Sequence, residues 1–146
     1  MQAVRDPGTA DHPGGLLQRI QVVTVTAGEN GNFHQEIFDV AGGPNTADVD
    51  LDTCRPRGPG AASLCATWRD PDFDPEEPAA WYARVLENPS CRWSWWECLR
   101  LPVEERPEAC AAESFPRTLQ ERAWTSPIWF EPAPPGHLVR GSNETN

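Results

Sequence analysis

The sequence predicts a mainly β protein, an antiparallel β-sandwich with long loops that disulfides can staple. Five or six short segments rich in β-branched and aromatic residues are separated by turn signals, and helical periodicity is almost absent. The 16 prolines and 11 glycines among 146 residues favour short strands and long loops over helices. Seven tryptophans indicate an ordered chain, because disordered segments are poor in aromatic residues.

The first two strands are predicted to form a hairpin. Residues 19–26 are dense in Ile, Val and Thr, whose stiff χ1 angles suit an extended backbone. A turn over residues 28–32, which contains two glycines and two asparagines, leads to a returning strand at residues 35–40. Residues 1–17 lack periodicity and are predicted to be a linker or a disordered lead-in.

Two further strands are predicted after a long loop over residues 41–60. The first covers residues 64–68 and places Trp68 on its apolar face. The second covers residues 81–87. Alternation along this strand assigns side chains to two faces: Trp81, Ala83 and Val85 to one, and Tyr82, Arg84 and Leu86 to the other. Residues 91–110 are predicted to be an irregular excursion.

The last strand ends the predicted module. Alternation predicts that Trp124, Ser126, Ile128 and Phe130 share one of its faces. Pro127 removes a backbone donor, so this strand is expected at a sheet edge or with a bulge. The β-sandwich module is therefore expected to span residues 18–131, and residues 132–146 are expected to form a disordered tail.

The charge balance narrows the range of partners. Twelve arginines, no lysine and 22 acidic residues give a net charge of −10. Nucleic acid and anionic membranes require clustered cationic side chains, so neither is an expected partner. No apolar run reaches the ~20 residues that span a bilayer, and the first ten residues lack the apolar core of a signal peptide. Either the protein is cytosolic, or an export signal lies on a longer parent chain.

The five cysteines form no C-x-x-C pair, which argues against a zinc ribbon or a thioredoxin-type motif. Disulfides across the loops are the favoured interpretation and imply an oxidising compartment, whereas buried reduced cysteines are the alternative. The candidate pairs are Cys54–Cys65, from proximity alone, and Cys98–Cys110. Other pairings stay open, and at least one thiol is left over because five is odd.

Several segments resemble the C-terminal region of a bacterial family catalogued as domain of unknown function 3604. The segments are Leu64–Asp74, Trp81–Ser94 and Gln120–Phe130, together with Leu17–Val22 and Glu36–Val40, which resemble the hairpin that opens that region. The likeness extends over residues 16–131, and its motifs follow the order of the family.

That family resembles the metal-dependent hydrolases of the polymerase-and-histidinol-phosphatase superfamily. The resemblance implies an exported protein in which an α/β barrel holds a divalent metal, beginning with a His-x-His pair, and a β-rich C-terminal part packs against the barrel. The implied activity is metal-assisted hydrolysis of phosphoesters or related bonds. In the present chain the barrel is missing and there is no His-x-His.

The histidines of this chain do not form a recognisable metal site. His12, His34 and His137 lie far apart, whereas a catalytic metal needs about three converging ligands. No catalytic residue, metal ligand or cofactor is therefore assigned to this chain, and the divalent metal is expected in the parent protein.

One acidic run suggests calcium, since alternate carboxylates can surround a hard cation. The run contains Asp70, Asp72, Asp74 and Glu76. The EF-hand spacing fails, because Pro75 stands where Gly is required and Trp81 where the bidentate Glu belongs. A solvated acidic loop is the favoured interpretation.

The tryptophan-rich segment Cys91–Cys98 has three interpretations. It contacts the parent's barrel, it buries its own tryptophans as a stapled loop, or it is an exposed recognition loop for a ligand such as a sugar. Inter-domain contact is favoured, with Trp93, Trp95, Trp96 and Trp129 as its candidate residues. Candidates for the edge of a substrate cleft are Arg84, Arg92 and Arg122, with ion pairs to neighbouring glutamates as the alternative.

The expected function is that of a C-terminal accessory or structural β-module of a metal-dependent hydrolase, non-catalytic by itself, with an N-terminal barrel as its partner. The alternative is a free-standing secreted binding module that uses the Trp-rich loop. A third hypothesis, a complete enzyme, predicts metal-dependent hydrolysis of a phosphodiester by residues 1–146 alone, and we expect none. The cysteines and the family resemblance predict a periplasmic or secreted location.

Overall fold

The computed structural model describes residues 1–11, 13–28 and 31–133, which form antiparallel sheets and a short helical segment. The largest sheet contains, in spatial order, β10 (Arg122–Trp124), β7 (Ala79–Glu87), β2 (Leu17–Ala27) and β3 (Phe33–Gly42), and β11 (Ile128–Phe130) also pairs with β7. The predicted class, mainly β and antiparallel with disulfide-stapled loops, is confirmed.

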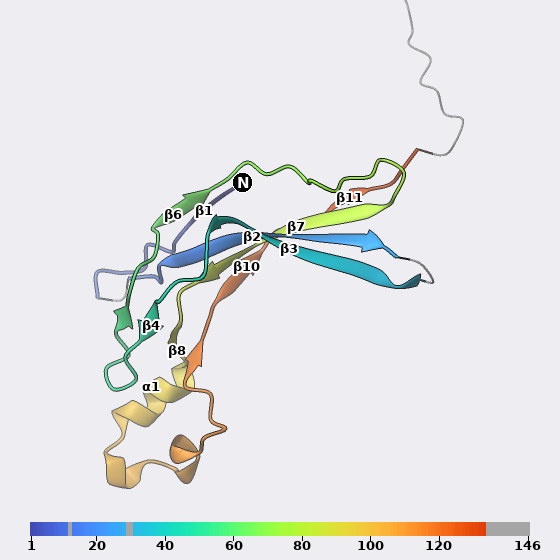
Figure 1. Cartoon of the computed structure of the whole chain (residues 1–146). Helices are drawn as coiled ribbons and strands as arrows, with labels where there is room; N and C mark the ends of the chain where they lie inside the picture. The colour runs from blue at the N-terminus through green and yellow to red at the C-terminus, as the bar shows by residue number, and fades with distance from the viewer. Residues whose placement is uncertain (12, 29–30, 134–146) are drawn as a thin grey trace, which may run out of the picture.

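Three two-stranded ribbons accompany the large sheet (Figure 1). They pair β1 (Gln2–Val4) with β6 (Ser63–Cys65), β4 (Asp48–Val49) with β5 (Pro56–Arg57), and β8 (Ser90–Cys91) with β9 (Thr118–Leu119). The ladder between β1 and β6 corrects the expectation that residues 1–17 are a linker or a disordered lead-in. Backbone hydrogen bonds to β6 order a segment that has no periodicity of its own.

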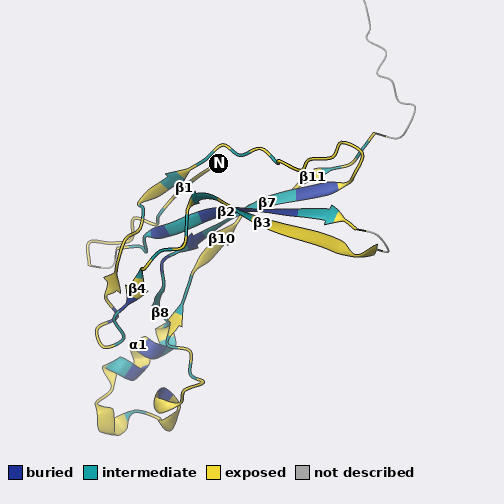
Figure 2. Cartoon of the chain, viewed as in Figure 1, coloured by how far each residue is buried: buried dark blue, intermediate teal, exposed yellow. Residues whose placement is uncertain are grey.

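The predicted hairpin is confirmed as β2 and β3. At its closed end the Gly28 N–H donates to the Asn32 carbonyl oxygen at 2.7 Å. Because β2 lies between β3 and β7, it supplies the most deeply buried side chains of the sheet, Ile20 and Val23. β3 forms an edge of the sheet and is mostly exposed, as Figure 2 shows.

The covered face of the large sheet lies beneath a second, thinner layer. This layer consists of the β1–β6 ribbon and the loop that follows β6 (Figure 1). Trp68 packs on Phe38 with ring centroids 5.3 Å apart. Phe73 packs on Trp81 at 5.9 Å and on Phe130 at 5.1 Å. The large sheet and this small layer are arranged as the two layers of a sandwich.

The segment between β8 and β9 is helical, which corrects the expectation of an irregular excursion over residues 91–110. It contains α1 (Trp93–Arg100) and the 3₁₀ turns η2 (Val103–Glu105) and η3 (Glu108–Ala111). Trp95 and Cys98 are three residues apart and face the interior, and this helical spacing outweighs the irregular composition. Among the described residues, no helix is both long enough and apolar enough to cross a membrane.

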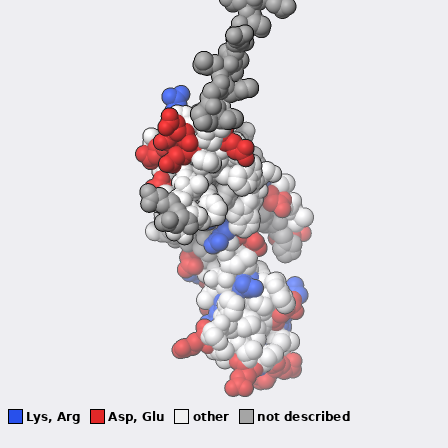
Figure 3. All heavy atoms as spheres, turned by 90° about the vertical axis from the view of Figure 1, so that its right-hand side faces the viewer, with Lys and Arg blue, Asp and Glu red and all other residues white. Residues whose placement is uncertain are grey.

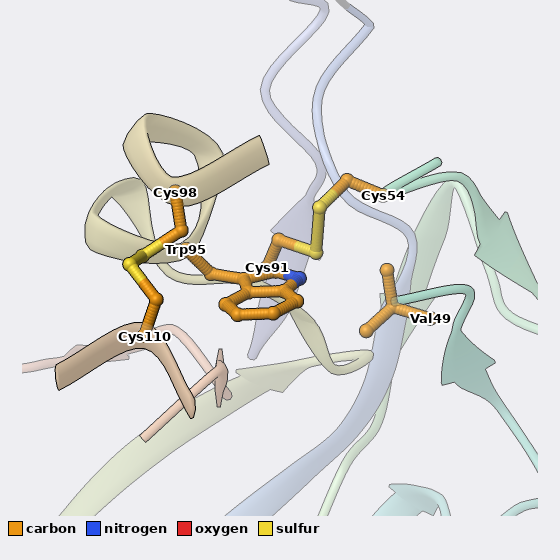
Figure 4. Packing of buried hydrophobic residues seen from close by; sticks show 6 residues of the cluster. All are labelled: Val49, Cys54, Cys91, Trp95, Cys98 and Cys110. Atoms are coloured by element: carbon orange, nitrogen blue, oxygen red, sulfur yellow. A yellow bond between two sulfur atoms is a disulfide. The ribbon is translucent and has the colours of Figure 1, made fainter. Parts of the chain in front are cut away.

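A small second core lies in the cysteine lobe, which comprises the β4–β5 and β8–β9 ribbons, α1, η2 and η3. Trp95 occupies its centre between the two disulfides (Figure 4). The Trp95 Nε1–H donates to the Leu51 carbonyl oxygen at 2.7 Å. The Arg117 guanidinium lies 4.7 Å from the centre of the Trp95 ring, within the range of a cation–π interaction.

The disulfides are Cys54–Cys91 and Cys98–Cys110, and Cys65 is an exposed free thiol. The candidate pair Cys98–Cys110 is therefore present, whereas the candidate pair Cys54–Cys65 is wrong. Cys65 lies in β6, whose pairing with β1 holds it away from the lobe. Cys54 instead follows β4 toward β8, where its Cα lies 5.6 Å from that of Cys91.

A one-residue bulge breaks the last strand of the sheet. Trp124 pairs with Arg84, whereas Ile128 pairs with Trp81, so the chain between them contains one more residue than the β7 segment it faces. The predicted position of this strand, at an edge or with a bulge near Pro127, is confirmed. The predicted common face for Trp124 and Ile128 is wrong, because the bulge inverts the alternation.

Candidate interaction surface

The large sheet has a covered face, which packs against the β1–β6 layer, and an opposite face, here called the open face. The open face is the candidate functional site. Cross-strand partners point to the same side of a sheet, so the register assigns each side chain to one face. The open face carries Phe33, Gln35, Ile37 and Asp39 from β3; Arg19, Gln21, Val23 and Val25 from β2; Ala80, Tyr82, Arg84 and Leu86 from β7; and Arg122, Trp124 and Trp129 from β10 and β11.

The aromatic patch occupies one half of the open face and consists of Phe33, Ile37, Tyr82, Trp124 and Trp129. Phe33 and Trp129 are 78% and 75% exposed, Trp124 is 59% exposed and Ile37 is 47% exposed. Side chains of this size and exposure leave on the order of 500 Å² of apolar surface in water. This area is within the roughly 300–600 Å² of the largest apolar patch on a typical monomer, and such a patch is often functional.

A shallow groove of about 190 Å³ lies at the end of the sheet, where Phe33 and Trp129 of the aromatic patch form part of its lining. Phe33 and Trp129 form opposite sides of its lining, and Val25 and Ala80 lie between them in neighbouring strands. All four side chains are apolar, so the groove suits the apolar side chains of a partner.

The arginine corner occupies the other half of the open face and consists of Arg19, Arg84 and Arg122. The Arg84 Nε–H donates to Gln21 Oε1 at 2.6 Å, and the Gln21 amide donates to Asp39 Oδ1 at 2.7 Å. Arg19 Nη1 lies 3.3 Å from Asp39 Oδ2. This network holds the side chains of three neighbouring strands in one plane of the sheet.

The charge of the open face is opposite to that of the chain as a whole. Three arginines and one aspartate give the strands a balance of +2 on this side, whereas the chain carries −10. Acidic side chains gather at both ends of the molecule in the view of Figure 3.

On the covered face, burial raises the pKa of the Glu87 carboxyl above its ordinary value, and the charges of Glu121 and Asp6 raise it further.

The acidic loop after β6 is held by its own hydrogen bonds. Asp70 accepts a hydrogen bond from the Trp81 indole at 2.6 Å and another from the Asp72 backbone N–H at 3.0 Å. Asp74 accepts one from the Glu76 backbone N–H at 2.8 Å. These carboxylates therefore stabilise turns of the loop.

Within residues 1–11, 13–28 and 31–133, no three His, Cys, Asp or Glu side chains are grouped so that they could hold a metal ion.

Comparison with protein families matches residues 1–132 to a family model described as "Protein of unknown function (DUF3604)". The chain belongs to the DUF3604 family. The match includes β1, so the family's sequence pattern extends through the first ribbon as well as the large sheet. No curated protein and no solved structure matches the chain.

The four tryptophans predicted to make inter-domain contact do not form one surface in this DUF3604 chain. Trp129 lies in the aromatic patch. Trp93 and Trp96 are exposed on α1, at the opposite end of the molecule from β11 (Figure 1). Trp95 is only 7% exposed and is a core residue of the cysteine lobe. The three tryptophans of the Cys91–Cys98 segment therefore differ in burial. They lie on a helix, which turns Trp95 toward the core and leaves Trp93 and Trp96 exposed, whereas a loop had been predicted.

The three arginines predicted at a cleft edge are likewise divided. Arg84 and Arg122 both point to the open face, two residues apart in register on neighbouring strands. Arg92 immediately precedes α1 in the cysteine lobe and is remote from them in the strand order. Sequence reasoning missed Arg19 as the third member of the corner.

Three residues of the aromatic patch, Phe33, Ile37 and Tyr82, were also missed as surface candidates. The alternation of Phe33, Gln35 and Ile37 along β3 is a detectable signal for one apolar face. Trp124 was grouped on one face with Ile128 and Phe130, because the hydrophobic pattern does not show that the bulge separates them. The open face therefore became visible only with the strand register.

Proposed function

We propose that this DUF3604 chain is a non-catalytic accessory β-module that packs through its open face on a separate domain, a metal-dependent hydrolase of phosphoesterase type. The aromatic patch is the observation that carries the proposal. The hydrolase character of the partner rests on the family resemblance, which relates DUF3604 proteins to polymerase-and-histidinol-phosphatase enzymes with a barrel.

The size of the patch fits a domain contact. A standard protein interface buries about 800 Å² on each partner, and the patch supplies on the order of 500 Å² of apolar area. At ~25 cal/mol per Å² this area is worth roughly 12 kcal/mol, and association of separate molecules costs about 4–15 kcal/mol. A covalently linked partner avoids much of that cost, so the patch suits a neighbouring domain better than a transient partner.

The cellular location belongs to the same proposal. Two disulfides are compatible with an extracellular location, because thiols stay reduced in the cytosol of most organisms. We place the module in the periplasm or outside the cell. The exposed thiol of Cys65 would then be the single cysteine available for mixed disulfides.

The docking proposal is tested with the barrel itself. The DNA upstream of the Met1 codon is expected to encode a segment with a His-x-His pair, and this segment is co-expressed with residues 1–146. We expect the two to co-elute in size-exclusion chromatography. The double variant Trp124→Ser/Trp129→Ser should separate them, and the matched double variant Trp93→Ser/Trp96→Ser should not. Absence of such a segment, or equal effects of the two variants, contradicts the proposal.

The non-catalytic assignment has a separate test. Purified residues 1–146 are incubated with Mn²⁺, Mg²⁺ or Zn²⁺ and bis(4-nitrophenyl) phosphate, and release of 4-nitrophenol is followed. We expect no rate above that of the metal alone. Turnover that chelation abolishes would contradict the assignment and support a complete enzyme.

A second candidate function has one observation in its favour. Trp93 and Trp96 are three residues apart on α1, so they lie on one side of the helix, and both are exposed. Such a pair can stack on a sugar ring or on a partner's side chain. A secreted binding module predicts tryptophan fluorescence changes with a soluble oligosaccharide, and Trp93→Ser should abolish them while Trp124→Ser should not.

A further inference from the structure

We infer that the open face docks a protein surface whose apolar centre is bordered by carboxylates, and that the arginine corner receives these carboxylates. The inference rests on the proposed function, since it names the chemistry of the partner for the same face. The inference adds that the partner must carry carboxylates beside its apolar centre, which apolar packing alone does not require.

The register brings the three guanidinium groups together. Arg19 of β2 and Arg122 of β10 both pair with Leu86 of β7, one from each side. Arg84 lies two residues along β7 from Leu86 and points to the same face. Diagonal neighbours in a sheet are about 7–8 Å apart, so long arginine side chains from these positions can converge on one anion.

The positive charge of the corner is only partly neutralised from within. Asp39 is bound to Arg19 and also accepts from Gln21. The Arg84 Nε–H donates a hydrogen bond to the amide oxygen of Gln21. Arg84 makes no ion pair with the described residues. Arg122, which is exposed, makes none either. Two guanidinium groups therefore keep their paired Nη donors, the geometry that binds a carboxylate in bidentate fashion.

The corner is continuous with the aromatic patch. Trp124 pairs with Arg84 across the strand and is two residues from Arg122 on β10. A partner that covers Trp124 would exclude water from the guanidinium groups, and lower local dielectric strengthens a charge-assisted hydrogen bond. The carboxylates are therefore expected beside the apolar centre of the partner.

A protein surface fits this site better than a phosphorylated small molecule. The arginines stand on a sheet face beside an apolar patch of interface dimensions, and ligand sites are usually enclosed clefts. The charge also favours an acidic partner at this corner, because the corner carries a positive balance on a chain whose net charge is −10. Arginine and aromatic residues are the types that dominate interface energetics.

The test uses the intact chain and two fluorescent probes, the aromatic anion 8-anilinonaphthalene-1-sulfonate and the neutral dye Nile red. We expect the chain to bind both. Arg122→Gln should weaken binding of the anion about fivefold, the loss of one charge-assisted contact, and leave Nile red unchanged. Trp124→Ser should weaken both probes, and added NaCl should weaken only the anion.

Two controls address folding and location. Arg92→Gln removes an arginine that lies outside the open face, and it should change the affinity for neither probe. Arg84→Lys keeps the charge and loses the fork of donors, so it should weaken the anion less than Arg122→Gln does. Unchanged far-ultraviolet circular dichroism and an unchanged midpoint of urea unfolding in each variant establish that the sheet is intact.

Several results would overturn the inference. They are failure of the wild-type chain to bind the anion, equal loss with Arg92→Gln, and no loss with Arg122→Gln. Inorganic phosphate that displaces the dye far better than chloride of equal ionic strength would assign the corner to a phosphate ester. The dye experiment does not involve the barrel, so failed co-elution with intact dye binding refutes the proposed function alone.

Discussion

Trp95 is the side chain on which the packing of the cysteine lobe most depends. It is buried beside both disulfides, and its indole N–H donates a hydrogen bond to the carbonyl oxygen of Leu51. We expect Trp95→Ala to lower the free energy of unfolding by about 3–5 kcal/mol, because it leaves a cavity and an unpaired carbonyl. Urea denaturation followed by circular dichroism measures this. Trp93→Ala, on the exposed side of α1, should stay within about 0.5 kcal/mol, and equal losses would contradict the assignment.

Glu87 makes stability depend on pH. Burial, and then the charges of Glu121 and Asp6, raise the pKa of its carboxyl in the folded state above the value in the unfolded chain. The folded state binds the proton more tightly, so the contribution to stability is present below the unfolded pKa and is lost as pH rises through the folded pKa.

We therefore expect Glu87→Gln, which cannot ionise, to raise the Tm at neutral pH. The difference from wild type should shrink as the pH falls below the ordinary glutamate pKa. Differential scanning fluorimetry over a pH series measures it. Glu97→Gln, on the exposed side of α1, is the control and should leave the Tm nearly constant. A gain for Glu87→Gln that is constant with pH would contradict the electrostatic cause.

At the scale of elements, Gly42 fixes the end of β3 against the start of β2. Its φ is +67°, and a Cβ there would lie 2.2 Å from the carbonyl oxygen of Gln18. A left-handed conformation costs a non-glycine residue about 1–2 kcal/mol even without such an overlap. We expect Gly42→Ala to cost more than about 2 kcal/mol in urea denaturation.

Gly43 provides the matched control for that element. A Cβ at Gly43 meets nothing within 4 Å. Gly43→Ala should therefore change stability by less than about 0.5 kcal/mol. Similar losses at both positions would show that the hairpin end tolerates no side chain at all, and would refute the steric account of Gly42.

The elements also show where sequence patterns fail. β2, β3 and β7 were predictable because alternation and β-branched residues operate within each strand. Pro127 predicted an edge or a bulge for the last strand, but the exact position of the break between β10 and β11 was not predictable, because it depends on a side chain. Thr125 Oγ1 accepts the Ala83 N–H at 3.0 Å and substitutes for a backbone partner, so the extra residue is accommodated without an unpaired donor.

At the scale of the whole molecule, the cysteine lobe and the large sheet have separate cores. The disulfides close loops with separations of 37 and 12 residues, worth about 4 and 3 kcal/mol in chain entropy. A core of a few side chains cannot offset their loss. We expect reduction to remove amide protection in α1 and η3 while β2 and β7 stay protected, as measured by hydrogen exchange with mass spectrometry.

The oxidised Cys65→Ser variant should keep the protection of wild type, because that thiol is free. Loss of protection in β2 at the same rate as in α1 would mean that the two cores unfold as one unit. If amide protection persists in both β2 and α1 after reduction, the disulfides are dispensable for the stability of the lobe.

The sequence by itself determined the β class, the hairpin, the irregular last strand, predicted at an edge or with a bulge, and the family. These properties follow from local propensity and short-range alternation, which act between residues close in the chain. Only the tertiary structure decided that Cys54 meets Cys91 and that Arg19, Arg84 and Arg122 share a face. Those neighbours depend on the register between strands distant in sequence, and one residue inserted before Ile128 changes which side chains meet.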